Sequence, residues 1–227
     1  MTTLYTSDSH LSHTNIIRYA KRPYRDVAEM NADIVAKLRE AEAACDRLVH
    51  AGDLCFNLRF FLEQHGPIFA SNVGKIFVAG NHDRMAPGPK MDAYASQFDA
   101  ICGDERTWKE HNYALIDTLD GQWVKVLVSH KPQSVTEGVN VYGHVHNNLL
   151  FPGEGHHPED DWVMASGVHF CACVELHDFR PVSLQQLADA HRSGYPLAAP
   201  AVAQHFAIYP PSAVESLSSL SPRGDDQ

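Results

Sequence analysis

The chain has 227 residues, of which 44% are hydrophobic and 20% are charged, as expected of a globular protein that buries one sizeable core. Its formal net charge of −10 argues against a broad basic face, which makes a long nucleic acid an unfavoured partner. No apolar run approaches the roughly 18–20 residues of a membrane span and no secretion signal opens the chain, so we expect a cytoplasmic protein without a membrane contact.

Strand-like and helical segments alternate in the first half of the chain. The segments 3–8, 47–53 and 75–81 are short and apolar, as buried strands are. Between them, residues 26–45 place apolar side chains three or four positions apart, which predicts an amphipathic helix capped by Asp26 and Glu29. Residues 58–66 predict a short helix that Gly66 ends. This alternation predicts a parallel sheet with helices on its faces.

The second half of the chain predicts hairpins and short strands. Residues 112–119 and 122–130 flank Asp120-Gly121, which is a strong hairpin signal. Further strands are expected at 139–145, 162–166 and 170–177, and a last helix from about Ser183. Parallel units followed by hairpins predict two sheets packed face to face between helices.

The composition shifts to proline, alanine and serine from Tyr195 onward. We therefore divide the chain into a domain of residues 1–194 and a C-terminal extension of residues 195–227. The five cysteines show no C-x-x-C spacing, which favours buried reduced thiols over disulfides or a cysteine zinc site.

Five short polar segments each follow a predicted strand, at the edge where ligand sites collect in open α/β sheets. A single histidine in such a place is more often a hydrogen-bonded loop residue than a ligand. Five together indicate a binding site. The segments are Asp8-Ser-His10, Gly52-Asp53, Gly80-Asn81-His82-Asp83, Ser129-His130 and Gly143-His144-Val-His146.

The residue types in these segments suit a pair of divalent metal ions. Asp8 and His10 lie two positions apart, so their side chains share a face of an extended chain. A carboxylate such as Asp53 can bridge two cations about 3.5–4 Å apart. Mixed oxygen and imidazole ligands disfavour Ca²⁺. We expect Mn²⁺ first, with Fe, Zn²⁺, Ni²⁺, Co²⁺ or Mg²⁺ as alternatives.

The ordered set D-x-H, G-D, G-N-H-D, H and G-H-x-H resembles the calcineurin-like metallophosphoesterase superfamily. The resemblance extends over about residues 1–187, because VELHDFRPVSL is similar to the end of small bacterial and phage members. It implies an α/β fold, a four-layer α/β/β/α sandwich with two mixed sheets flanked by helices. It also implies a first metal held by Asp8, His10 and His146, a bridging Asp53, and a second metal held by Asn81, His130 and His144.

The same resemblance implies hydrolysis of phosphate esters by a hydroxide that the two metals activate. His82 would lie near the leaving group, and Asp83 would hold His82 in orientation, although Asp83 is alternatively a loop cap. His13 and Arg84 are further candidates for substrate binding. The alternatives are a capping or solvent-facing residue for His13 and a solvated loop residue for Arg84.

Three functions fit this pattern. They are a phosphodiesterase for small or nucleotide-like substrates, a phosphomonoesterase or phosphoprotein phosphatase, and a non-catalytic scaffold. A scaffold is expected to lose metal ligands, whereas every ligand position here is filled. The absence of a recognisable cap domain favours a small phosphorylated substrate, and the oligomeric state is open.

Overall fold

The computed structural model describes residues 1–70, 72–83, 85–103, 111–147 and 166–195, and two sheets pack face to face in this part of the chain. The first sheet has the strand order β4-β3-β2-β1-β9 and the second has the order β5-β6-β7-β8. The strands are β1 (Thr3–Thr6), β2 (Arg47–His50), β3 (Gly74–Val78), β4 (Ala100–Cys102), β5 (Asn112–Leu119), β6 (Gln122–Ser129), β7 (Val139–Tyr142), β8 (His169–Cys171) and β9 (Val182–Ser183). The helices are α1 (Thr14–Tyr19), α2 (Val27–Ala44), α3 (Leu58–His65), α4 (Pro89–Ala95), α6 (Leu184–Arg192) and the 3₁₀ turn η2 (Val174–Leu176).

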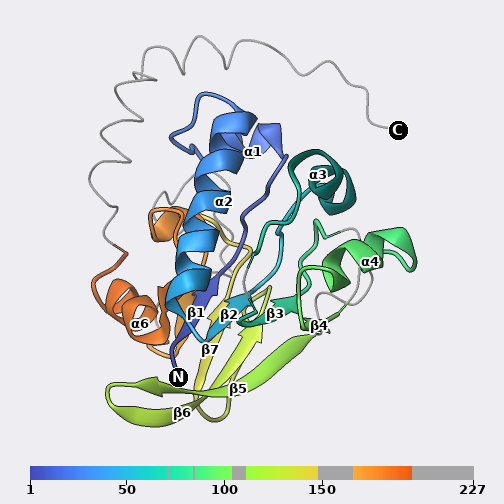
Figure 1. The fold of residues 1–227 in the computed structure, drawn as a ribbon. Coiled ribbons are helices and arrows are strands. Elements are labelled where there is room, and N and C mark those ends of the chain that lie inside the picture. Colours follow the sequence, from blue (N-terminus) through green and yellow to red (C-terminus); the bar gives the residue numbers. More distant parts are fainter. Residues whose placement is uncertain (71, 84, 104–110, 148–165, 196–227) are drawn as a thin grey trace, which may run out of the picture.

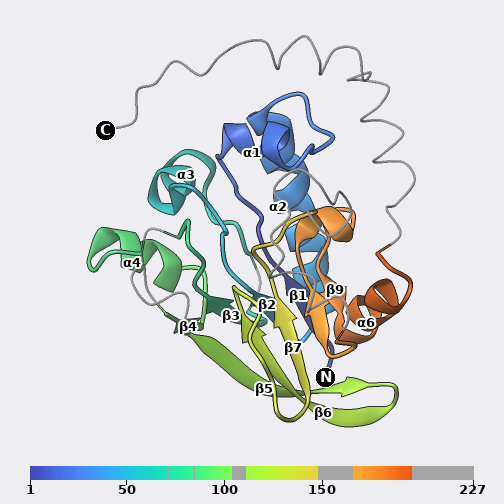
Figure 2. The same ribbon diagram turned by 180° about the vertical axis from the view of Figure 1, so that it is seen from behind.

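Both sheets are mixed and are flanked by helices, as predicted. Strands β1 to β4 run parallel, while β9 pairs antiparallel with β1. In the second sheet β5 and β6 form the expected antiparallel hairpin, and β6, β7 and β8 run parallel. In Figure 1 α2 lies in front of β1, and the view from behind in Figure 2 brings β5 and β7 to the front.

Helix α2 covers the first sheet because its apolar residues recur on one side. The side chain of Asp26 accepts a hydrogen bond from the backbone N–H of Glu29, which starts the helix where the sequence predicts. Met30, Ile34 and Leu38 are buried in a core shared with helices α1, α3 and α4 and the outer face of the first sheet. A second core lies between the two sheets.

Helix α6 joins the two sheets at one side of the sandwich. Ser183 and Gln186 form a capping box at its start, and Leu184 and Leu187 enter the core between the sheets. Tyr195, the first residue of the predicted extension, is buried, and its hydroxyl accepts a hydrogen bond from the backbone N–H of Cys171. Residues 196–227 lie outside the described residues, so the domain division stays a prediction.

The predicted strand 170–177 is wrong beyond Cys171. Ala172 still donates its N–H to the carbonyl of Tyr142, but Cys173 forms an isolated bridge with Ser7 and Val174 begins η2. The chain thus passes from the second sheet to the end of β1, which explains why the pairing with β7 stops. The predicted strand 162–166 lies outside the described residues except for Ser166.

Within the described residues, no helix combines the length and the apolar character that a membrane span requires.

Candidate metal centre

The loops that carry the five motifs meet at one edge of the sandwich. The loops after β1 and β2 run side by side, because the N–H groups of Asp8 and His10 donate to the carbonyls of Gly52 and Asp53 at 2.9 Å. The backbone N–H of His144 donates to the Asp8 carboxylate at 2.9 Å, which attaches the loop after β7. Segments far apart in sequence therefore surround one small volume.

The backbone is strained at five of the seven predicted ligands. Their φ angles are positive although none is glycine, and an L-residue pays about 1–2 kcal/mol for this conformation. Such strain persists only where the surrounding structure fixes it, and it is concentrated at functional sites. The five angles are 56° at Asp8, 49° at His10, 56° at Asp53, 77° at His144 and 50° at His146.

The first ligand group contains Asp8, His10 and His146, whose ligand atoms all lie within 4.8 Å of one another. Asp8 Oδ1 is 3.8 Å from His10 Nε2 and 3.6 Å from His146 Nε2. The three side chains predicted to hold the first metal are therefore brought together.

A second ligand group contains Asp8, Asp53 and His130. His130 Nε2 lies 3.0 Å from Asn81 Oδ1, which is also 3.0 Å from His144 Nδ1. The predicted ligands of the second metal thus converge as well. Asp53 Oδ2 is close to a histidine of each group, 3.4 Å from His10 Nε2 and 3.5 Å from His130 Nε2.

These residues fit divalent cations. Ligand atoms bound at about 2.0–2.2 Å to one ion lie roughly 3–3.5 Å from each other, and the separations here are close to that range. Asp8 Oδ1 and His10 Nε2 are buried and have no hydrogen-bond partner. Unsatisfied buried polar atoms are rare in folded proteins, and a cation between them would satisfy both.

The charges of the cluster also favour a cation. Burial, together with the charges of Asp83 and Asp8, raises the pKa of Asp53 to about 7. Burial alone would raise the pKa of Asp8 too, but the imidazole of His146 holds it well below its usual range. Burial lowers the pKa of His10 to about 3, which keeps this ring neutral and able to donate a lone pair.

Two glycines allow the backbone to approach the predicted ligands closely. A Cβ on Gly80 would collide with the carboxylate of Asp53, and a Cβ on Gly143 would collide with Oδ2 of Asp8. Any larger residue at either position would displace a predicted metal ligand.

Asp83 does not hold His82 in orientation, so this part of the prediction is wrong. Its carboxylate accepts hydrogen bonds from the backbone N–H groups of Asp53 at 2.7 Å, Leu54 at 3.1 Å and Gly80 at 2.7 Å, and from the hydroxyl of Tyr94 at 2.9 Å. The side chain is buried between two loops, whereas His82 lies on the exposed side. Asp83 therefore fixes the backbone around the predicted bridging carboxylate.

His82 and His13 both lie beside the ligand groups. The ring centroid of His82 is 5.2 Å from that of His10. The backbone N–H of His82 donates to Asp53 Oδ1 at 2.8 Å. His13 Nδ1 is 3.3 Å from His10 Nδ1. His13 occupies the N-cap position of α1, but its side chain makes no capping hydrogen bond. Arg84 lies outside the described residues.

Two residues that the sequence did not single out support the ligands. Glu175 Oε1 accepts from His146 Nδ1 at 3.0 Å, which directs Nε2 of that ring towards Asp8. The buried guanidinium of Arg22 donates to the same Glu175 oxygen at 2.7 Å and to the carbonyls of Asp8 and Ser9 at 2.6 and 2.8 Å.

For Glu175, the sequence feature that could have indicated its role is the segment C-A-C-V-E, which ends at this residue. In the same segment the thiol of Cys173 donates to Asp8 Oδ2 at 3.3 Å, so the segment contacts the ligands twice. Arg22 carried no signal, because it lies in none of the five motif segments.

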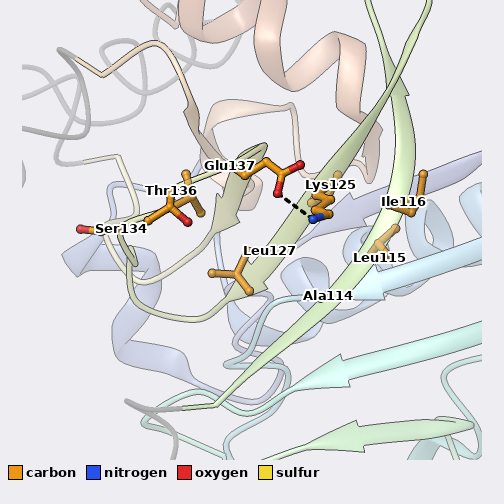
Figure 3. Close-up of a pocket in the computed structure, with 10 residues that line it drawn as sticks. Ala114, Leu115, Ile116, Lys125, Leu127, Ser134, Thr136 and Glu137 are labelled. Carbon is orange, nitrogen blue, oxygen red and sulfur yellow. Dashed lines mark hydrogen bonds and ion pairs between the residues drawn. The ribbon is translucent and has the colours of Figure 1, made fainter.

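A separate hollow of about 380 Å³ lies on the side of β5 and β6 that faces away from the first sheet (Figure 3). An ion pair of 2.7 Å between Lys125 and Glu137 crosses it. None of the predicted site residues that the structure describes lines it, so it is separate from the metal centre.

Comparison with known proteins yields one family and several remote relatives. A family model described as calcineurin-like phosphoesterase matches residues 1–205. The uncharacterized protein MJ1445 of Methanocaldococcus jannaschii is 24% identical over 188 residues, which are 83% of this chain and 90% of that protein.

One solved structure shows the fold. The protein of unknown function AQ665 from Aquifex aeolicus is similar with a TM-score of 0.52 and 22% identity, over 80% of this chain and 95% of that one. The Pseudomonas putida nuclease MPE gives a TM-score of 0.36 at 17% identity over 63% and 61% of the two chains, which is too weak to indicate a shared activity.

Proposed function

Since this chain belongs to the calcineurin-like phosphoesterase family and is a metal-dependent phosphoesterase, we propose that it hydrolyses phosphodiester bonds of small or nucleotide-like substrates at two divalent metal ions. The observation that carries the proposal is the position of Asp53 Oδ2, 3.4 Å from His10 Nε2 and 3.5 Å from His130 Nε2. A carboxylate oxygen close to a histidine of each ligand group is what a pair of bridged cations needs.

When bound, two such cations supply an activated water as nucleophile and neutralise the phosphoryl charge, and Mn²⁺ is the proposed metal. The residues of the chain hold the ligands in place, since Glu175 orients His146 and Asp83 fixes the loop of Asp53. His82 lies on the exposed side of the cluster, where it can donate a proton to the leaving oxygen.

We also propose a location and a class of partner from the composition. All five cysteines are free, four of them buried and Cys102 half-buried, which favours a reducing compartment such as the cytoplasm. The net charge of −10 favours a small phosphorylated substrate over a long nucleic acid.

Metal removal and replacement tests this function. We expect the metal-stripped protein to be inactive and added Mn²⁺ to restore hydrolysis of bis-p-nitrophenyl phosphate, with Mg²⁺, Zn²⁺ and Ni²⁺ compared in turn. Metal content measured by mass spectrometry should reach two ions per chain. Hydrolysis of p-nitrophenyl phosphate alone would support a phosphomonoesterase instead, and two bound ions without any hydrolysis would support a scaffold.

Replacing His82 by alanine tests the proton donor. We expect kcat to fall by about 100-fold or more for diesters with poor alkyl leaving groups, because general acid catalysis contributes on that scale. Hydrolysis of p-nitrophenyl esters, whose leaving group needs no proton, should change little. His111→Ala, at an exposed histidine outside the motifs, is the control. Equal activity of His82→Ala and wild type on alkyl esters would remove His82 from the mechanism.

A further inference from the structure

A buried hydrogen bond joins Ser9, which lies between two predicted metal ligands, to His50. Ser9 Oγ is 2.9 Å from Nε2 of His50, and both side chains are fully buried. Ser9 separates Asp8 from His10 in the sequence. His50 ends β2, three positions before Asp53. The pair therefore connects the loop after β1 to the strand that leads to the predicted bridging carboxylate.

This hydrogen bond lies on the side of the first sheet that the helices cover. The ring centroid of His50 is 5.6 Å from that of Phe77, which belongs to the core shared with α1, α3 and α4. On the same side the guanidinium of Arg22 donates to the carbonyl of Ser9 at 2.8 Å and to Sδ of Met30 in α2 at 3.4 Å. The side chain of Ser9 thus enters this core, while its two neighbours carry the ligand atoms.

A serine beside a histidine is also the arrangement of a nucleophile and its base, but burial excludes that role here. Neither side chain is exposed, so a substrate does not reach the hydroxyl of Ser9. Burial also lowers the pKa of His50 to about 3, which keeps the ring neutral. Among the described residues Nδ1 of His50 has no hydrogen-bond partner, a cost that an apolar side chain would avoid. Packing alone therefore does not account for this histidine.

The loop around Ser9 needs restraint, because the residues on both sides of it are strained. The φ angle is 56° at Asp8 and 49° at His10, and such angles persist only where the surrounding structure fixes them. Asp8 belongs to both ligand groups and His10 to the first. A loop that relaxed at Ser9 would therefore move ligand atoms of both groups.

We propose that His50 is a positioning residue, which through its hydrogen bond to Ser9 holds the loop of Asp8 and His10 in the geometry that binds the metal ions. The inference rests on the proposed function, because it assigns His50 to the same metal centre. His50 acts through Ser9 and not by contact with the substrate. Loss of a group that supports a metal ligand in this way weakens metal binding by about 10–100-fold.

Titration of the metal-free protein with Mn²⁺, followed by calorimetry, tests the role of His50. We expect Ser9→Ala and His50→Leu each to weaken Mn²⁺ binding by about 10-fold or more. The double variant should bind no more weakly than the weaker single variant, because both substitutions remove the same hydrogen bond. His50→Gln should retain most of the affinity, since its amide nitrogen lies near the place of Nε2 and can bond to Ser9.

Tyr5→Phe is the matched control. The hydroxyl of Tyr5 donates to Asp117 at 2.7 Å in the core between the sheets, so this variant also removes a buried hydrogen bond from β1. Thermal unfolding of the metal-free proteins should show that Tyr5→Phe loses stability. Its affinity for Mn²⁺ should nevertheless equal that of wild type, because the bond lies on the other face of the sheet.

The inference is overturned if Ser9→Ala and His50→Leu bind Mn²⁺ as tightly as wild type, or if Tyr5→Phe weakens binding equally. It is also overturned if His50→Gln binds no better than His50→Leu. If His50→Leu does not fold, Ser9→Ala and His50→Gln decide the outcome. Two bound ions without hydrolysis of any diester would overturn the proposed function, while weaker Mn²⁺ binding by the variants would still support the role of His50.

Discussion

Replacing Asp53 by asparagine is expected to lower kcat/KM for phosphodiesters by well over about 100-fold. Loss of a residue that merely supports a metal ligand already costs about 10–100-fold in affinity or activity. Asp53 Oδ2 lies within 3.5 Å of ligand nitrogens from both groups, so the substitution weakens both metal positions at once. Metal content and kcat/KM at saturating Mn²⁺ measure the two consequences separately.

The same substitution should leave the metal-free protein at least as stable as wild type. Burial and the nearby Asp83 and Asp8 raise the pKa of Asp53 to about 7, above the ordinary value near 3.9 of an unfolded aspartate. The ionised carboxylate therefore destabilises the metal-free fold as pH rises above about 4, and asparagine removes that cost.

Thermal unfolding with and without Mn²⁺ measures how Asp53→Asn changes stability in the metal-free and the metal-bound protein. Wild type should gain stability on metal addition because the ions bind only the folded state, whereas Asp53→Asn should gain little. Asp92→Asn, at an exposed carboxylate of α4, should behave as wild type. A variant that is strongly destabilised without metal, or stabilised by Mn²⁺ as much as wild type, would contradict the bridging position of Asp53.

The clustering of the predicted ligands could be predicted from sequence because each follows a strand. Once β1, β2 and β3 are parallel neighbours, the residues after them must meet at one edge, so Asp8, Asp53 and Asn81 could be placed together without coordinates. The role of Asp83 could not be found in this way. Its side chain could face His82 or the neighbouring loop, and only the path of the loop decides.

Helix α2 was predicted from its long apolar repeat, whereas helix α1 and strand β9 were not predicted. Helix α2 spans 18 residues and carries both its apolar repeat and its cap in the sequence. Helix α1 has six residues and β9 has two, too few for any repeat, and β9 exists because it pairs with β1. Tertiary pairing, rather than local preference, produces β9.

The pairing of Arg22 with Glu175 could not be predicted, because it depends on tertiary structure. The two residues are 153 positions apart in the sequence, and nothing local marks them as partners. Arg22 is 1% exposed and donates to one carboxylate and two carbonyls. Burial alone would raise the pKa of Glu175, but Arg22 and His146 lower it to about 2, so this carboxylate stays ionised inside the protein.

Replacing Arg22 by methionine is therefore expected to cost about 3–5 kcal/mol of unfolding free energy, the usual result of leaving one charge of a buried pair without its partner. Arg39→Met is the matched control. Arg39 also donates to two carbonyls, those of Ile68 and Pro67, but it is exposed and its loss should cost about 1 kcal/mol or less. Urea unfolding of the metal-free proteins measures both values.

The double variant Arg22→Met/Glu175→Gln separates charge from packing. Removing the carboxylate charge should recover part of the lost stability, because no buried charge then remains without a partner. Recovery should be incomplete, since the carbonyls of Asp8 and Ser9 still lack their donor. Metal affinity should stay about 10–100-fold weaker, because an amide in place of the Glu175 carboxylate is a weaker acceptor for the N–H of His146. If Arg22→Met costs no more than Arg39→Met, the buried pair does not stabilise the loop that carries Asp8.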